Sequence, residues 1–109
     1  MHATAWHNSV PSTEPTGYGI KLIARDRDRH FQTEWDSIVL DLDGGESTTV
    51  ALAPSFWRSC PELRSAVIGQ WLIDQGVAPW SSGSPPGVVV HHLAGSRFSA
   101  RVLRSRSLR

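Results

Sequence analysis

Residues 54–76, PSFWRSCPELRSAVIGQWLIDQG, form the one stretch of this chain that is long and periodic enough to predict a helix by itself. Five of its apolar residues recur at helical spacing: Leu63, Val67, Ile68, Trp71 and Leu72. Side chains at this spacing form one apolar stripe along a helix. The opposite face is polar but carries only one arginine. We therefore predict a helix of about fourteen residues that is buried under a sheet, rather than one that reads a DNA groove.

The two ends of this helix have their own signals. Ser59 and Glu62 fit a capping box, in which the two side chains satisfy backbone amides that have no partner in the first turn. Pro61 is tolerated there because its missing N–H would have no partner in any case. At the other end, Gly76 can adopt the left-handed conformation that ends a helix, and Pro79 blocks continuation. The sequence therefore predicts a helix that begins near Ser59 and ends at Gly76.

Gly69 lies within the predicted helix, where a glycine costs about 1 kcal/mol relative to alanine. The missing side chain allows another part of the chain to come unusually close. We expect a strand or the ring of Trp71 to make that close approach.

The composition limits the class of protein. A chain of 109 residues makes one domain, and its nine glycines and seven prolines favour an α+β plan rich in turns. A single cysteine excludes an internal disulfide framework and an all-cysteine metal cluster. No apolar run approaches the roughly 20 residues of a membrane span, and the N-terminus lacks the features of a signal peptide. We therefore expect a cytoplasmic protein without a membrane partner.

Short alternating segments around the helix predict five strands, at residues 20–24, 37–42, 46–52, 88–93 and 97–103. The turn DGG at residues 43–45 joins the second and third strands into a hairpin, because its glycines accept a positive φ. The predicted fold class is α+β, with a curved, mainly antiparallel, barrel-like sheet of about five strands packed on one main helix. This domain spans residues 18–103, between a disordered leader at residues 1–17 and a disordered basic tail at residues 104–109. Within the leader, Trp6 is expected to tuck against the domain or a partner chain, or to be exposed.

Basic residues are unevenly distributed along the chain. Residues 97–109 hold five arginines and no acidic side chain, whereas residues 1–96 hold six basic and ten acidic side chains. This balance argues against nucleic-acid binding by overall charge, but it permits a basic arm that binds nucleic acid.

The segment RDRDRHF at residues 25–31 has two interpretations. Its charges cannot be buried unpaired, so it forms an exposed turn or short helix. This surface is either solvated and self-neutralising, or it contacts phosphates through its arginines. In the second case the binding residues are Arg25, Arg27 and Arg29, together with Arg97 and Arg101 on the last strand.

The chain holds five tryptophans, and most of them are expected in the core. Trp80, in the sequence APWSSGSPPG, is predicted to line an aromatic groove that binds a ligand. Tryptophans close to an arginine-bearing loop are also suited to stacking on nucleic-acid bases.

Familiar catalytic and metal-binding patterns are absent from the sequence. His91 and His92 are neighbours on a predicted strand, so they point to opposite faces and do not chelate one metal ion. Cys60 with a histidine is the one candidate nucleophile pair, although a small cysteine beside Pro61 is also typical of a core. We therefore predict no enzymatic activity, no metal and no cofactor. A small enzyme that uses Cys60 or His91 is the third interpretation.

Three segments, RDRDRHF, SFWRSCPELRS and APWSSGSPPG, resemble a family of small uncharacterised bacterial proteins over roughly residues 16–100. That resemblance implies no activity. The order of elements (strand, short charged segment, hairpin, helix, hairpin) also resembles the B3-like pseudobarrel DNA-binding domains. This second resemblance implies DNA recognition by loop arms, but no residue motif matches, so no binding residue is carried over.

These observations together predict a non-enzymatic binding module. Nucleic acid is the first partner that they favour, through the arginine-bearing segments. The alternative is a protein-interaction or homo-oligomerisation domain, because edge strands of a small sheet invite pairing and an exposed tryptophan makes an anchor.

Overall fold

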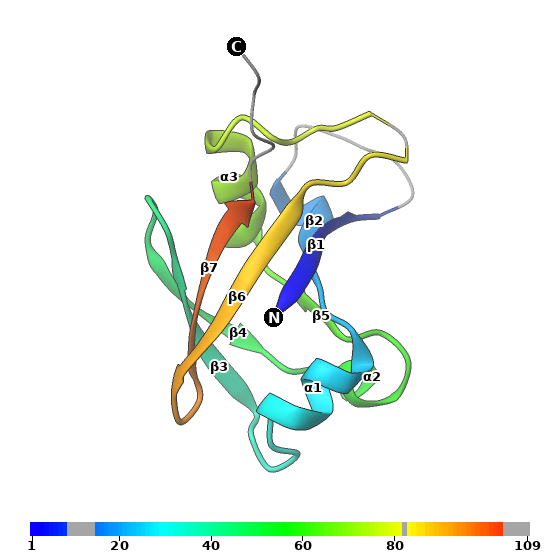
Figure 1. Ribbon diagram of the computed structural model, residues 1–109, viewed down its shortest axis with the longest axis vertical. Coiled ribbons are helices and arrows are strands. Elements are labelled where there is room, and N and C mark those ends of the chain that lie inside the picture. Colours follow the sequence, from blue (N-terminus) through cyan, green and yellow to red (C-terminus); the bar gives the residue numbers. More distant parts are fainter. Residues whose placement is uncertain (9–14, 82, 104–109) are drawn as a thin grey trace.

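Within residues 1–8, 15–81 and 83–103, which the computed structural model describes, the chain forms seven strands, three α-helices and one 3₁₀ turn. In chain order they are β1 (His2–His7), η1 (Pro15–Gly17), β2 (Tyr18–Lys21), α1 (Ala24–His30), β3 (Ser37–Leu42), β4 (Ser47–Ala51), α2 (Pro54–Arg58), β5 (Glu62–Arg64), α3 (Ala66–Asp74), β6 (Gly87–Ala94) and β7 (Arg97–Leu103). Figure 1 shows α3 near one end of the strands, and α1 and α2 at the other.

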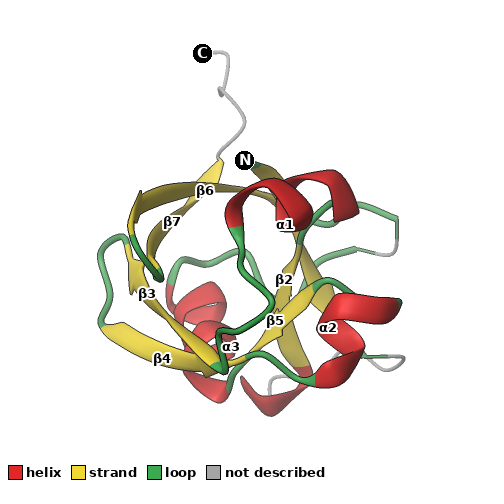
Figure 2. Cartoon of the chain, turned by 90° about the horizontal axis from the view of Figure 1, so that it is seen from below, coloured by secondary structure: helices red, strands yellow, loops and turns green. Residues whose placement is uncertain are grey.

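The strands form one sheet in the order β4-β3-β7-β6-β1-β2-β5. The pairing of β3 with β7 is parallel, and the other five pairings are antiparallel. The first and last strands in this order, β4 and β5, also contact each other. The sheet therefore curls into a nearly closed barrel (Figure 2). This confirms the predicted α+β, barrel-like and mainly antiparallel fold, with seven strands rather than five and three helices rather than one.

The core fills the inside of this barrel. Inward-facing side chains alternate along the strands, as in β7, where Phe98, Ala100 and Val102 are buried. From α3, Ile68 and Leu72 are fully buried in the same core. The helix is thus the buried scaffold that the sequence predicts, although it covers one end of a barrel and does not lie under an open sheet.

The predicted start of the main helix at Ser59 is wrong. α3 begins six residues later, where the Ser65 hydroxyl accepts a hydrogen bond of 3.1 Å from the amide of Val67. The preceding residues form α2 and then β5, which pairs with β2. Leu63 belongs to the helical stripe in the sequence, but in β5 it points into the core and is fully buried. Glu62 bonds to Arg64 and makes no capping box.

The predicted end of the helix is confirmed. Gly76 has a φ of +77° and donates its amide to the Ile73 carbonyl at 2.9 Å. Gly69 is also a site of close approach, because a Cβ there would lie 1.9 Å from the carbonyl oxygen of Pro15. The approaching segment is η1, and not the strand or the Trp71 ring that we expected.

The expectation of a leader without structure is wrong for β1. This strand lies between β6 and β2, and the N-terminal ammonium donates to the Val90 carbonyl at 2.7 Å. Its inward residues, Ala3 and Ala5, are small, so the strand has a weak apolar pattern even though it pairs on both sides. Residues 9–14 of the predicted leader and the predicted tail at residues 104–109 lie outside the described residues.

Two hairpins follow the sequence prediction closely. β3 and β4 pair from Ser37↔Ala51 to Asp41↔Ser47, and Gly44 in their turn has a φ of +75°. β6 and β7 form the second hairpin. No helix in the described part of the chain is long and apolar enough to cross a membrane.

Candidate nucleic-acid interface

One exposed surface of the barrel is built from the outward side chains of β7, β6, β1, β2 and β5. We call it the outer face, and its members are His2, Thr4, Trp6, Lys21, Glu62, Arg64, Val89, His91, Arg97, Ser99, Arg101 and Leu103. Val89 points to this side but is only 8% exposed. The strand register aligns them in rows across the sheet, since paired residues on neighbouring strands point to the same side. One row runs from Arg101 through Val89 to His2, and the next contains Thr4 and Lys21.

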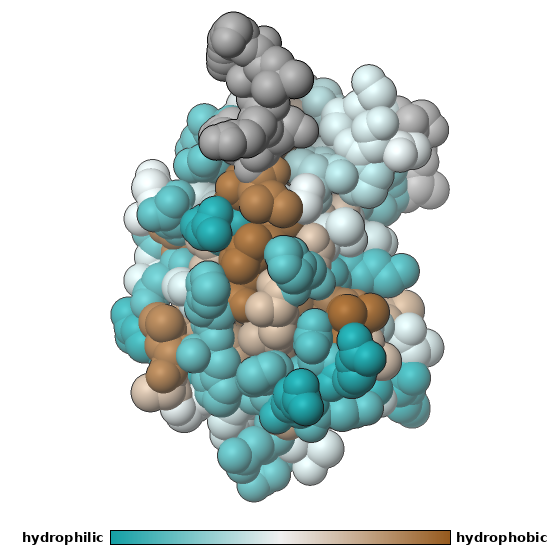
Figure 3. Space-filling view, viewed as in Figure 1, coloured by the Kyte–Doolittle hydropathy of each residue, from teal (hydrophilic) through white to brown (hydrophobic). Residues whose placement is uncertain are grey.

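Figure 3 looks onto β6, β7 and β1 from outside. An apolar patch lies over β6 and β7, and hydrophilic side chains surround it. Leu103 is one exposed apolar residue of β7, with 45% of its surface accessible. The outer face therefore combines charged groups with apolar area on one surface.

Two acidic groups of this region, Glu62 and Asp41, are paired with arginines, whereas Asp43 has no ion pair within the described residues. Glu62 binds Arg64 at 2.5 Å, and Asp41 on β3 binds Arg97 at 2.8 and 2.9 Å. In the part of the chain that the structure describes, Lys21 and Arg101 have no ion pair. The outer face consequently carries uncompensated positive charge, although residues 1–96 are acidic as a whole.

Asp41 is held as a carboxylate by its neighbours. The Ser47 hydroxyl donates to it, and the Arg97 guanidinium both donates to it and attracts its charge. These contacts, with that of Ser47 the largest, lower the pKa of Asp41 from its ordinary value despite an opposing effect of desolvation. Arg97, predicted as a phosphate contact, is therefore shared with a carboxylate at the border of the outer face.

Beside this pair lies a hollow of about 380 Å³, lined by Asp41, Asp43, His91, Ser99 and Arg101 among others. Its charges have both signs. No group of three histidine, cysteine, aspartate or glutamate side chains in the described residues is placed to hold a metal ion. His91 and His92 diverge as expected: His91 lines this hollow, whereas the ring of His92 stacks on Phe98 with a centroid distance of 4.5 Å.

The structure separates the three arginines of the RDRDRHF segment. Arg27 is buried, and its guanidinium donates to the Phe56 carbonyl in α2 and to Asp28, at 2.9 Å each. Its predicted role in binding is thus at odds with its position, because a buried guanidinium that is already bonded is not available to a phosphate. Arg25 and Arg29 are exposed and have no ion pair within the described residues.

The remaining two arginines lie on a helix that borders the outer face. Ile23, directly before α1, lines a hollow with His2 and Lys21, and at the far end of α1 the ring of His30 contacts that of His92 at 5.6 Å. Figures 1 and 2 accordingly place α1 beside the N-terminal end of β1. Arg25 and Arg29 are therefore exposed on a helix that lies next to the N-terminal end of β1.

Trp80 lines a third hollow, and the ligand-binding aromatic groove expected there stays a prediction. This hollow has a volume of about 340 Å³, and Trp6, His7, Lys21 and Pro85 are among its other lining residues. The ring of Trp80 is half-buried and contacts His7 at 4.9 Å. Sequence reasoning did not assign Trp6 or Lys21 to this site. The alternation from His2 to Trp6 was the available signal, but the alanines at its inward positions made it weak.

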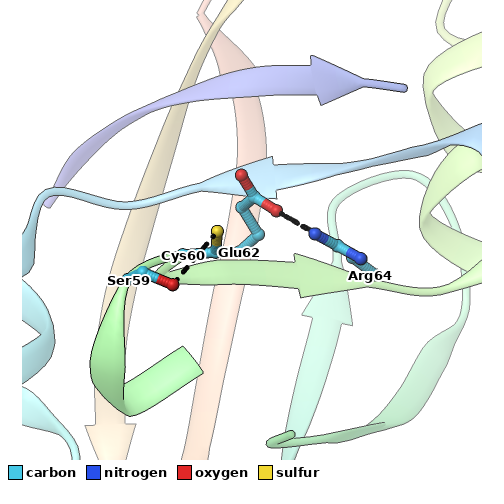
Figure 4. A network of polar contacts seen from close by, with 4 residues as sticks. All are labelled: Ser59, Cys60, Glu62 and Arg64. Carbon is cyan, nitrogen blue, oxygen red and sulfur yellow. Dashed lines mark hydrogen bonds and ion pairs between the residues drawn. The ribbon is translucent and has the colours of Figure 1, made fainter. Parts of the chain in front are cut away.

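Trp6 is held in place across the sheet by an arginine. The guanidinium carbon of Arg64 lies 4.5 Å from the centre of the Trp6 ring. Gly19 on β2 lies between the two residues in the register, so no side chain separates them. Figure 4 shows Arg64 bonded to Glu62 along β5. A cation above a tryptophan ring stabilises the pair by roughly 0.5–1 kcal/mol at an exposed site.

Cys60 lies just before β5 and lines neither the Asp41 hollow nor the Trp80 hollow. It is half-buried, and its sulfur accepts a weak hydrogen bond of 3.6 Å from the Ser59 hydroxyl (Figure 4). Among the described residues, no hydrogen bond joins it to a histidine. The geometry of Cys60 thus offers little support for a nucleophile pair.

Comparisons with protein-family models, curated proteins and solved structures found no match to this chain.

Proposed function

We propose that this protein is a non-enzymatic module that binds nucleic acid on its outer face. One observation carries the proposal. The register of β7, β6, β1 and β2 places Arg101 and Lys21, two cations without an acidic partner in the described residues, on the same exposed surface as Trp6. Phosphate contacts supply most of the affinity of such surfaces, and exposed aromatic rings add stacking on bases.

The dimensions of the sheet suit an extended strand of nucleic acid. β7 and β2 are separated by two strands in the sheet order, so Arg101 and Lys21 lie roughly 15 Å apart across the strands. At about 3.4 Å per stacked nucleotide this distance corresponds to some four nucleotides. Arg25 and Arg29 are four residues apart on α1, a spacing that puts them on one side of the helix, and they add charge at the border.

A salt titration of a labelled oligonucleotide tests this proposal. We expect the affinity to fall as salt rises, because phosphate contacts release counterions. Removing one phosphate contact, as in Arg101→Gln or Lys21→Gln, should lower the salt slope by about one. Arg58→Gln is the matched control, since Arg58 is also exposed but lies on α2. Affinity that is insensitive to salt, or equally affected by all three variants, contradicts the proposal.

The alternative is a homo-oligomerisation or protein-interaction domain, and this remains a prediction. The end strands β4 and β5 contact each other, which leaves less free edge than an open sheet has. The exposed large apolar residues, Ile23, Leu93 and Leu103, lie before α1, on β6 and on β7. Sedimentation with and without nucleic acid distinguishes the two functions. A cytoplasmic location, where Cys60 stays reduced, belongs to the same proposal.

A further inference from the structure

We infer that the hollow beside Trp80 accepts one unstacked base, so that the protein prefers single-stranded nucleic acid to a duplex. This inference rests on the proposed function and names its substrate class. The hollow has a volume of about 340 Å³, near the lower end of the roughly 300–1,000 Å³ typical of small-ligand pockets. It is therefore suited to a single aromatic group rather than to a larger ligand.

The walls of the hollow offer aromatic surface that is held in position. Trp80 contacts Tyr18 at 5.4 Å, and Tyr18 is almost fully buried in the core. His7 supports Trp80 from β1, with ring centroids 4.9 Å apart. Because Trp80 is half-buried rather than buried, part of the residue remains accessible at the hollow that it lines. A fixed, partly exposed indole is the kind of platform on which an unpaired base stacks.

Positive charge lies beside this aromatic surface. Lys21 lines the hollow and has no acidic partner within the described residues. Arg64 places its guanidinium over Trp6, a second lining residue, and its exposed side chain also reaches solvent. Aromatic rings flanked by cations match a base attached to a phosphate. A proline-rich peptide needs the rings but not the cations, so this combination favours nucleic acid.

Access to the hollow explains why single-stranded nucleic acid should be preferred to a duplex. In a duplex the bases are already stacked on their neighbours, and extracting one costs a few kcal/mol. In a single strand a base turns outward at much lower cost, while its phosphates remain near Lys21 and Arg64. The site therefore discriminates by the availability of a free base, and not by reading base edges.

The test compares the affinities of a thymidine oligonucleotide and a duplex of equal length for the full chain, for Arg101→Gln and for three further variants. Trp80→Leu removes the stacking ring and should weaken single-strand binding by roughly five- to 150-fold, the range expected for one stacked base. Thr4→Phe fills the hollow from an exposed strand position, so it keeps the core intact and should abolish the single-strand preference. Trp57→Leu is the matched control, because Trp57 is a half-buried tryptophan on α2.

Each outcome of the experiment has a distinct meaning. The expected result is a loss of the single-strand preference in Trp80→Leu and Thr4→Phe, with little change in Trp57→Leu. Equal affinity of the full chain for both oligonucleotides overturns the inference, and if Arg101→Gln still weakens binding the proposed function stands. A proline-rich peptide that binds in a Trp80-dependent manner, in place of the oligonucleotide, also overturns it. If neither oligonucleotide binds, the proposed function fails as well.

Discussion

Two regions of this protein use arginine in opposite ways. Where α1 meets α2, the guanidinium of Arg27 is buried, donates to the Phe56 carbonyl and lies 6.0 Å from the ring of Trp57. On the outer face, Arg101 is exposed, and no ion pair holds it in the described part of the chain. The first arginine holds two helices together, and the second is free to contact a ligand.

This difference shows that the density of arginines in a sequence does not measure the charge that a surface presents. The segment from Arg25 to Arg29 has the highest local density in the folded domain, but its central member is used internally. The outer face collects its cations from strands that are far apart in the sequence. Burial and register, rather than composition, decide which arginines are available.

Removing the buried arginine, Arg27, tests whether it stabilises the fold, and this change should have the largest effect. In Arg27→Ala the Phe56 carbonyl loses its donor in a buried position, which costs roughly 1–3 kcal/mol. We expect that decrease in the free energy of unfolding, measured by urea denaturation. The matched control is Arg25→Ala, an exposed change on the same helix that should stay within about 0.5 kcal/mol. Equal effects of the two substitutions contradict the structural role of Arg27.

Double variants that each remove two positive charges test whether the exposed cations bind a ligand. The double variant Lys21→Gln/Arg101→Gln should lower the salt slope of oligonucleotide binding by about two, because each cation is proposed to contact a phosphate. Arg25→Gln/Arg29→Gln removes the same charge from the border of the surface and should produce a smaller decrease. If the α1 pair has the larger effect, the binding surface is centred on α1 and not on the sheet.

The contact between Arg64 and Trp6 provides a finer test on the outer face. Arg64→Gln removes the cation from the indole ring, and we expect a loss of roughly 0.5–1 kcal/mol in the free energy of unfolding. A change in the fluorescence of Trp6 should accompany it. Arg58→Gln serves again as the control for an exposed arginine without a ring contact. A fully stable Arg64→Gln protein would show that the ring contact contributes nothing.

The smallest effect concerns pH. The pKa of Asp41 is lowered in the folded protein, so the folded state holds its proton less tightly than the unfolded chain does. The stabilisation is fully present above the ordinary value of 3.8 and is lost as the pH falls through the lowered value. Ser47→Ala should raise the pKa of Asp41 in an NMR titration, and Arg97→Gln should raise it as well. If the pKa of Asp41 is unchanged in Ser47→Ala, the Ser47 hydroxyl does not lower it.

Much of the barrel is predictable because its signals are local. The hairpin of β3 and β4 follows from alternating apolar residues around a glycine turn, and Gly76 marks the end of α3. Each of these signals depends on a few neighbouring residues, whose conformational preferences are distinct enough from those of other residues to be recognised in the sequence.

The sequence predictions are wrong where a local pattern is compatible with two different structures. Leu63, flanked by polar residues, satisfies both a helical stripe and a strand that alternates, and pairing with β2 decides for the strand. In β1 the inward side chains are alanines, so the strand depends on its backbone partners on both sides more than on its own apolar area. For that reason the sequence did not assign Trp6 to the hollow beside Trp80.

The sequence by itself determined the apolar stripe of α3, its glycine end and the two hairpins, because those features depend on residues close together in the chain. Only the tertiary structure decided that β1 inserts between β6 and β2, that Arg27 is buried, and that Lys21, Arg64 and Arg101 share one face. These features come from pairing between distant strands. Such pairing is selected by the backbone hydrogen bonds and burial of the whole barrel, which no short window of sequence contains.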